Sequence, residues 1–363
     1  MLFYYVRAFG LFLVLFAAGF SLRLAVLRRH KLVIGILDTV GLLGTALLSG
    51  WFFSWAFHVP FPAGFLFGAV VSGTDPATLI PLFKHHRVPE DVETIIVTEA
   101  IFNGPLAIIL TMVALFLLVP SVPGFAPVEP ILTGTGLYTA AVLYFLYQIF
   151  VSAGIGLAIA VATYHSILRF GLHKSPYTQI LGLAAAFAGY VTGEFVGASG
   201  FLVVTIIGLI LGNHGEVFKK ARPEVDEAVR RNVEFNDVLS TFSVIFIFVL
   251  LGASLDLRDL QWHVIGTSVL VALFVIFVAR PLSSLPILPW TGFKRFLFIS
   301  LEGPKGAVAA SMAILPVVLG RVYNSPELID WGEMILSAGL MTVLLSMLLE
   351  SAWVSTLRAR LLD

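Results

Sequence analysis

Long apolar stretches separated by short polar connections fill almost the whole chain. A helix that crosses the ~30 Å hydrocarbon core of a bilayer needs about 20 apolar residues, and eleven stretches reach or approach this length. The predicted spans are residues 6–27, 31–57, 62–83, 92–119, 134–165, 176–196, 198–213, 233–255, 261–286, 294–319 and 328–355. The pattern therefore predicts an all-α polytopic membrane protein with about 11 transmembrane helices.

Two of these spans carry glycine and proline in their middle. Ser72–Pro76 interrupts span 62–83, and Leu301–Gly306 interrupts span 294–319. Helix breakers at membrane depth leave backbone groups unwound, and transporters build ion sites from such groups. Both spans are therefore predicted to be broken helices.

An internal repeat supports a transporter architecture. Gly19–Leu24 in the first span echoes Gly252–Leu257 in the eighth, and a similar order of features follows each segment. The two copies begin seven helices apart, and an odd offset reverses their orientation in the bilayer. The predicted fold is an inverted-repeat secondary transporter, with the two broken helices crossing near the midplane.

Composition agrees with a membrane protein and excludes several other classes. The chain is 58% hydrophobic and 12% charged, whereas a soluble domain carries roughly 25% charged residues. A net charge of zero gives no basic surface that would bind nucleic acid. The absence of cysteine excludes disulfides and thiolate metal sites.

Basic residues in the connections predict the orientation. Seventeen of the 22 lysines and arginines fall on one side of the predicted spans, including the polar linker 213–231, and three fall on the other. Because cytoplasmic loops are enriched in lysine and arginine, the N-terminus is expected outside and the C-terminus in the cytoplasm. The loop Pro120–Pro130 holds no basic residue and is expected outside.

Ionisable residues inside the spans are the candidates for chemistry, because a charge at membrane depth costs at least a few kcal/mol. Such residues near the midplane are Asp75, Glu99, Arg280, Glu302 and Lys305. Three other carboxylates near span ends, Asp38, Glu194 and Glu350, are expected to be interfacial.

Five segments resemble the monovalent cation/proton antiporter superfamily, within it the NhaP/NHE (sodium/proton exchanger) branch. In order they are Ser72–Pro76, Val88–Pro89, Thr98–Pro105, Ala279–Leu282 and Glu302–Gly306. The resemblance implies a six-helix transport domain that moves against a dimerisation domain, a homodimer, and no cofactor. It also implies that about two N-terminal helices of the family are lacking here.

The resemblance also implies roles for single residues. Thr74 and Asp75 match the pair that binds either a proton or the cation. Glu99 and Arg280 match an ion pair that holds the core together. Asn103 matches a polar residue near the site and is a candidate additional ligand, although helix–helix hydrogen bonding is an equal alternative.

The chain departs from the family pattern at several positions. Gly104 stands where the family has an aspartate ligand, Ala100 where it has serine, and Ser21 where many members have glutamate. Glu302 is a candidate replacement ligand, or else the partner of Lys305. Lys305 is expected to compensate the dipoles of the half-helices at the crossing.

These interpretations divide the chain into regions. They are 1–30, a first span on the scaffold side; 31–119, the first transport half with broken helix 62–83; 120–257, scaffold and dimerisation spans; 258–355, the second transport half with broken helix 294–319; and 356–363, a cytoplasmic tail.

The predicted function is exchange of protons for a monovalent cation across the cell membrane by alternating access, with Asp75 as the shared site. Na⁺ is favoured, and Li⁺ or K⁺ remain open. One alternative is a non-transporting or altered-specificity relative, because Gly104 replaces the expected aspartate. A remote alternative is an intramembrane serine protease using Ser199, although its histidine base would have to come from a loop or span end.

Overall fold

The computed structural model describes residues 2–119, 134, 136–172, 178–218, 223–253 and 262–362. The predicted outer loop Pro120–Pro130 and part of the repeated segment Gly252–Leu257 lie outside these ranges. All regular elements in the described ranges are helical. The chain forms two compact units. Unit 1 comprises Met1–Phe3, His30–Pro120 and Ile247–Asp363, and unit 2 comprises Tyr4–Arg29 and Ser121–Phe246.

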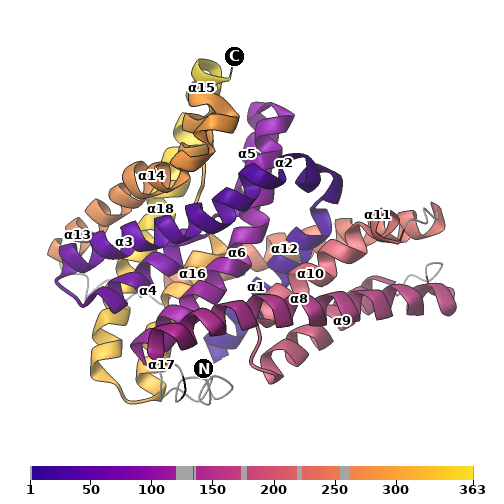
Figure 1. Ribbon diagram of the computed structural model, residues 1–363, viewed down its shortest axis with the longest axis horizontal. Coiled ribbons are helices and arrows are strands. Elements are labelled where there is room, and N and C mark those ends of the chain that lie inside the picture. Colours follow the sequence, from indigo (N-terminus) through magenta and orange to yellow (C-terminus); the bar gives the residue numbers. More distant parts are fainter. Residues whose placement is uncertain are drawn as a thin grey trace. The chain divides into compact units, whose positions relative to one another are not determined.

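Unit 1 contains the two broken helices and the helices around them (Figure 1). Its helices are α3 (Leu42–Phe57), α4 (Phe61–Ser72), α5 (Pro76–His86), α6 (Glu90–Leu118), α13 (Trp262–Phe274), α14 (Arg280–Ser284), α15 (Leu288–Leu301), α16 (Ala307–Ala313), α17 (Leu315–Val322) and α18 (Pro326–Leu361). Three short segments wind differently: the π-helical turns η1 (Leu37–Gly41) and η4 (Val275–Ala279) and the 3₁₀ turn η5 (Leu285–Ile287).

Unit 2 is also built from helices. They are α1 (Leu2–Ser21), α8 (Leu137–Arg169), α9 (Thr178–Phe195), α10 (Gly200–Gly212), α11 (His214–Val217) and α12 (Pro223–Ala253), the last of which continues into unit 1. The helix α2 (Leu24–Ile36) also belongs to both units. Within unit 2, α10 packs against α8 and α9.

Six helices in the described residues are long and apolar enough to cross a membrane, or seven if α4 and α5 form one bent span. Three shorter apolar helices accompany them: Ala8–Ser21, Gly200–Gly212 and Ala307–Val322. The predicted count of eleven is not confirmed. Two spans were expected to be separated between residues 286 and 294; the helical assignment covers Val264–Leu301 without a gap, but Gly292, in this interval, has a non-helical backbone with φ +72°.

Small residues allow α3 and α4 to pack closely. A Cβ added at Gly68 would overlap the Ala46 carbonyl oxygen, and one added at Gly64 would overlap the Gly50 carbonyl oxygen. Glycines four residues apart are a common device for bringing two membrane helices into backbone contact. This packing fixes α4, and therefore the start of its break.

Both predicted interruptions are present, and they contact each other. The helix α4 ends at Ser72 and α5 begins at Pro76, with a bend of 42° between them. Proline lacks an N–H group and disfavours a helical residue before it, so Asp75 is extended, with φ −113° and ψ 107°. The second break separates Leu301 from Ala307, and the Asp75 N–H donates to the Pro304 carbonyl across the crossing, at 2.9 Å.

Candidate functional site

Asp75 lies at the crossing of the two breaks and is buried, with 1% of its surface exposed. Its Oδ2 atom accepts hydrogen bonds from the Thr78 backbone N–H at 3.0 Å and the Thr78 hydroxyl at 2.6 Å. The side chain is therefore the N-cap of α5. The backbone N–H of Ala307, the first residue of α16, lies near the Asp75 carboxyl group and acts on it electrostatically. Helix N-termini favour negative charge, so both half-helices stabilise a carboxylate here.

The second oxygen of this carboxyl group has no hydrogen-bond partner. Asp75 Oδ1 is buried and unpaired, although buried polar atoms in folded proteins are nearly always satisfied. An unpaired carboxylate oxygen can accept a proton or coordinate a cation. The two oxygens of Asp75 thus have different environments, one structural and one open to a ligand.

Asn103 connects the first break to α6. Its Oδ1 accepts from the Thr74 backbone N–H at 2.9 Å, and its amide nitrogen lies 2.8 Å from Thr74 Oγ1. The same nitrogen donates to Glu99 Oε1 at 3.2 Å. Asn103 therefore holds Thr74 in place, which matches the helix–helix alternative for this residue.

Glu99 and Arg280 form a bidentate pair although 181 positions separate them in the sequence. Arg280 Nη1 lies 3.0 Å from Glu99 Oε1, and Nη2 lies 3.1 Å from Oε2. Both side chains are buried. Paired N–H···O bonds of this kind are among the stronger protein hydrogen bonds. How much the pair stabilises the fold remains a prediction.

The same guanidinium group also contacts the second break. Arg280 Nη2 donates to the Glu302 carbonyl oxygen at 3.2 Å, and a Cβ at Gly303 would overlap the guanidinium. Further along this break, a Cβ at Gly306 would collide with the Asp75 carboxyl. The glycines of residues 302–306 therefore leave room for the two charged groups that meet there.

Lys305 contacts the C-terminal end of a half-helix, whereas Asp75 contacts N-terminal ends. Its ammonium group donates to the carbonyl oxygen of Ser72, the last residue of α4, at 3.3 Å. Carbonyl groups at a helix C-terminus carry partial negative charge, so this contact has the chemistry expected for compensation of a half-helix dipole. Among the described residues, no ion pair within 4.0 Å joins Lys305 to Glu302, and the alternative that these two residues are partners stays a prediction.

Glu302 faces α18. It is fully buried, and its Oε1 atom accepts from Trp353 Nε1 at 3.1 Å. In the part of the chain that the structure describes, no hydrogen bond connects Glu302 with Asp75, Thr74 or Asn103. The side chain therefore belongs to a different set of contacts from the Asp75 site.

Two buried carboxyl groups were missed by the sequence interpretation. Asp38 and Glu350, which were expected near the membrane interface, are 9% and 2% exposed, a burial within the protein that the sequence interpretation did not predict. Glu350 Oε2 accepts from the Gly303 backbone N–H at 3.0 Å. Asp38 lies in the π-helical turn η1, and π-turns are frequent at functional sites. Neither position has a glycine–proline break in the sequence that would have marked it.

The positions that depart from the family pattern are also buried. Ala100 and Gly104 lie on the buried side of α6. The Gly104 Cα would be 3.8 Å from a Cβ placed at Gly73. A side chain at position 104 would therefore lie beside the first break. Ser21 belongs to unit 2, where its hydroxyl donates to the Ala17 carbonyl at 2.7 Å.

Ser199 has a structural contact that explains it without catalysis. Its hydroxyl accepts from the Leu202 backbone N–H at 3.3 Å and caps α10. Its own N–H donates to Ser152 Oγ at 2.9 Å. These contacts are those of a helix N-cap.

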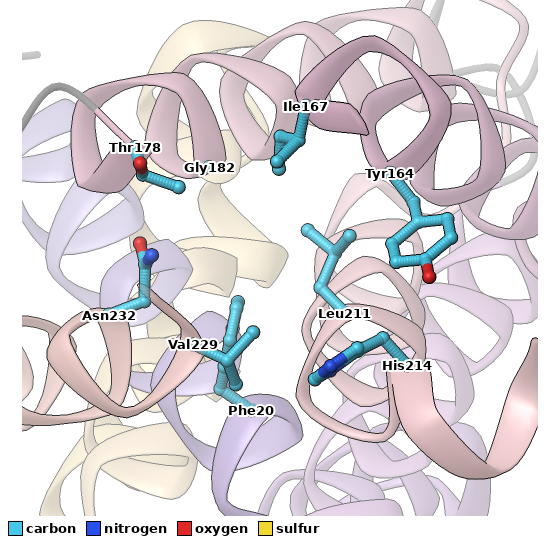
Figure 2. A pocket seen from close by; sticks show the side chains of 9 residues that line it. All are labelled: Phe20, Tyr164, Ile167, Thr178, Gly182, Leu211, His214, Val229 and Asn232. Atoms are coloured by element: carbon cyan, nitrogen blue, oxygen red, sulfur yellow. The ribbon is translucent and has the colours of Figure 1, made fainter. Parts of the chain in front are cut away.

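Unit 2 contains a small cavity lined by residues of α1, α8, α9, α10, α11 and α12 (Figure 2). The volume that the centre of a water molecule can reach inside it is about 20 Å³. This is enough space for one water molecule. The lining is mostly apolar; its members are Phe20, Tyr164, Ile167, Thr178, Gly182, Leu211, His214, Val229 and Asn232. The cavity contains none of the predicted site residues.

Known proteins resemble the chain over nearly its whole length. The family model of the transmembrane sodium/hydrogen exchanger matches residues 1–359. A probable Na⁺/H⁺ antiporter 2 of Methanocaldococcus jannaschii is 33% identical, over 97% of this chain and 83% of the relative. A K⁺/H⁺ antiporter NhaP2 of Shewanella oneidensis is 27% identical, over 97% of this chain and 57% of the relative.

The fold has a solved counterpart as well. The structure of the sodium proton antiporter MjNhaP1 from Methanocaldococcus jannaschii at pH 8 superposes with a TM-score of 0.82 at 30% identity, covering 99% of this chain and 86% of that one. These relatives are transporters and not enzymes. The sequence match and the superposition agree, and the chain belongs to the sodium/hydrogen exchanger family.

Proposed function

We propose that the chain is a secondary antiporter that exchanges protons for a monovalent cation, with Na⁺ as the favoured cation and Asp75 as the shared site. The observation that carries this proposal is the buried, unpaired Oδ1 atom of Asp75 at the crossing of two broken helices. The names of the relatives, which are Na⁺/H⁺ and K⁺/H⁺ antiporters, support a monovalent cation and a proton as the exchanged ions.

The exchange cycle follows from competition at one oxygen atom. Asp75 Oδ1 binds either a proton or the cation, because both neutralise the same charge. A bare carboxylate is costly at membrane depth, so the empty site reorients poorly and the loaded site reorients readily. Alternating exposure of the loaded site to the two sides then gives exchange. With one carboxylate involved, the simplest stoichiometry is one proton for one cation.

Oxygen atoms near Asp75 can complete a cation shell. The Thr74 hydroxyl exchanges hydrogen bonds with Asn103, but a hydroxyl has two lone pairs and one donor, so one lone pair remains. The breaks also free backbone carbonyl groups from helical hydrogen bonding. Hard oxygen ligands of this type suit small alkali cations better than soft metals.

The test is cation-induced proton flux in proteoliposomes that contain a pH-sensitive dye. Na⁺, K⁺ and Li⁺ are applied separately to the native protein, to Asp75→Asn and to Asp330→Asn. Asp330 is an exposed carboxylate on α18, so its variant controls for the loss of one charge. Flux in the native protein and in Asp330→Asn, and none in folded Asp75→Asn, is expected. Undiminished flux in Asp75→Asn would reject the shared site.

Gly104 supports a second candidate, a non-transporting or altered-specificity relative. The resembling family has an aspartate there, and in this chain the position beside the first break has no side chain. A native protein that is inserted and oriented but shows no flux with any of the three cations over roughly pH 6–9 would favour the non-transporting alternative. Flux with K⁺ or Li⁺ alone would indicate altered specificity.

We also propose the assembly and orientation of the transporter. The transport helices are assigned to residues 31–119 and 258–355, and the dimerisation spans to 120–257. The excess of basic residues on one side supports a cytoplasmic C-terminus in the cell membrane. A homodimer is the expected assembly.

A further inference from the structure

One face of α18 binds the second break at three successive turns. Ser346 Oγ accepts from the Lys305 backbone N–H at 2.9 Å, Glu350 Oε2 accepts from the Gly303 N–H at 3.0 Å, and Trp353 Nε1 donates to Glu302 Oε1 at 3.1 Å. Residues three and four apart lie on the same helix face. The carboxyl groups of Glu350 and Glu302 therefore meet at one crossing, because each is bound to the element that carries the other.

The described part of unit 1 buries more negative than positive groups. Five carboxyl groups and two cationic groups there are at most 9% exposed. They are Asp38, Asp75, Glu99, Glu302 and Glu350 on one side, and Arg280 and Lys305 on the other. Arg280 is matched by its bidentate partner Glu99. Lys305 is then the one cationic group left to balance the other four carboxyl groups among the described residues of unit 1. Because an isolated buried charge is too costly to persist, most of these four groups must be protonated.

Glu302 and Glu350 interact electrostatically with each other as well as with nearby cations. The charge of Glu302 acts on Glu350, and the charges of Arg280 and Lys305 act on Glu350 in the opposite sense. Arg280 also acts on Glu302. Two neighbouring buried carboxyl groups do not both ionise, and they titrate as a pair.

One oxygen at this crossing is left open. Glu302 Oε2 is buried without a hydrogen-bond partner, while Oε1 is held by Trp353 and Glu350 Oε2 by Gly303. A proton needs a single lone pair, whereas a cation needs a shell of several oxygens. The open oxygen therefore suits a proton.

We propose that Glu302 and Glu350 form a second proton-binding site that holds one proton, separate from the Asp75 site. The proton stays on this pair while the cation exchanges at Asp75. This proposal does not depend on whether the chain transports ions, because it concerns only whether a proton is bound to Glu302 and Glu350.

Infrared spectroscopy of the full chain in reconstituted membranes tests the proposal. Spectra in H₂O and D₂O are recorded in the Asp75→Asn protein, so that the Asp75 carboxyl does not contribute. Adding Glu302→Gln or Glu350→Gln is expected to remove the carboxylic-acid absorption of one group. Either variant suffices, because the one carboxylate that remains carries the same charge as the native pair with one proton bound, so no proton is then needed at this crossing. Saturating Na⁺ is expected to leave the absorption unchanged.

Glutamine keeps the oxygen that accepts from Trp353 or Gly303, so each variant retains its hydrogen bond to the crossing. Ser346→Ala is the matched control, since it removes a hydrogen bond to the same break without removing a carboxyl group, and its spectrum should keep the absorption. Unchanged absorption in both glutamine variants would overturn the proposal. Loss of the absorption on addition of Na⁺ would also overturn it, because the pair would then bind a cation.

Discussion

At the scale of single residues, Glu99 and Arg280 form a buried ion pair in which each charge compensates the other. Breaking a buried ion pair by removing one partner costs about 3–5 kcal/mol, because the other charge is left uncompensated. Glu99→Ala or Arg280→Ala alone should therefore lower the thermal stability sharply. The double variant should recover part of the loss. Thermal unfolding in detergent measures the cycle, and additive losses would contradict the pairing.

A second residue-scale prediction concerns Gly104. A carboxylate introduced beside the first break adds an oxygen near Asp75 and should strengthen cation binding. Gly104→Asp is therefore expected to lower the half-saturating cation concentration and to raise exchange in the proteoliposome assay. A variant that folds and shows the native cation dependence would show that position 104 does not reach the site.

The residue scale also shows what the sequence could and could not predict. Asp75, Glu99 and Arg280 were identifiable because charges inside apolar spans are costly and because their neighbours match a family pattern. Glu350 was missed because its position was judged by distance from a span end. The helix α18 has 36 residues, about 54 Å at 1.5 Å per residue, so its linear coordinate does not report depth. Asp38 was missed because a π-helical turn changes which side chains face inward.

At the scale of helices, close backbone packing supports the first break. The α3–α4 contact depends on glycine, since a Cβ at Gly68 would overlap the Ala46 carbonyl oxygen. Gly68→Ala is expected to lower the free energy of unfolding by about 1–3 kcal/mol through overpacking. Thermal unfolding provides the measurement.

The matched control is Gly266→Ala in α13, where an added Cβ meets nothing within 4 Å. Alanine favours a helix over glycine by up to about 1 kcal/mol, so this variant should be neutral or slightly stabilising. Equal losses at both positions would contradict close packing against the Ala46 carbonyl oxygen as the cause of the effect at Gly68.

The two helix breaks were predictable from the sequence, whereas the count of eleven spans stays a prediction. Glycine and proline mark Ser72–Pro76 and Leu301–Gly306 directly, because few other residues leave a membrane helix unwound. The boundary between the predicted spans 261–286 and 294–319 was placed from hydropathy alone. The chain is helical through Pro286 and Pro289, since proline is tolerated in the first turn of a helix, and it leaves helical geometry at Gly292.

At the scale of the whole molecule, the orientation can be tested without altering the native background. The chain has no cysteine, so a single introduced cysteine reports its own location. Glu327 and Ala359 are exposed at opposite ends of α18. In intact cells, a membrane-impermeant maleimide should label Glu327→Cys, and it should label Ala359→Cys only after permeabilisation. The native protein gives the blank, and the reverse labelling pattern would contradict a cytoplasmic C-terminus.

One oxygen of Asp75 caps a helix and the other has no partner. This difference determines how a mutation of Asp75 would affect the cell. Asparagine caps helices as well as aspartate does, so the Asp75→Asn protein would keep the bond from Thr78 through its amide carbonyl oxygen and lose only the titratable atom. The variant would fold, insert into the membrane and resist degradation by cellular proteases as the native protein does. Its failure would be visible only in the salt and acid balance of the cell, whose protein inventory would look entirely normal.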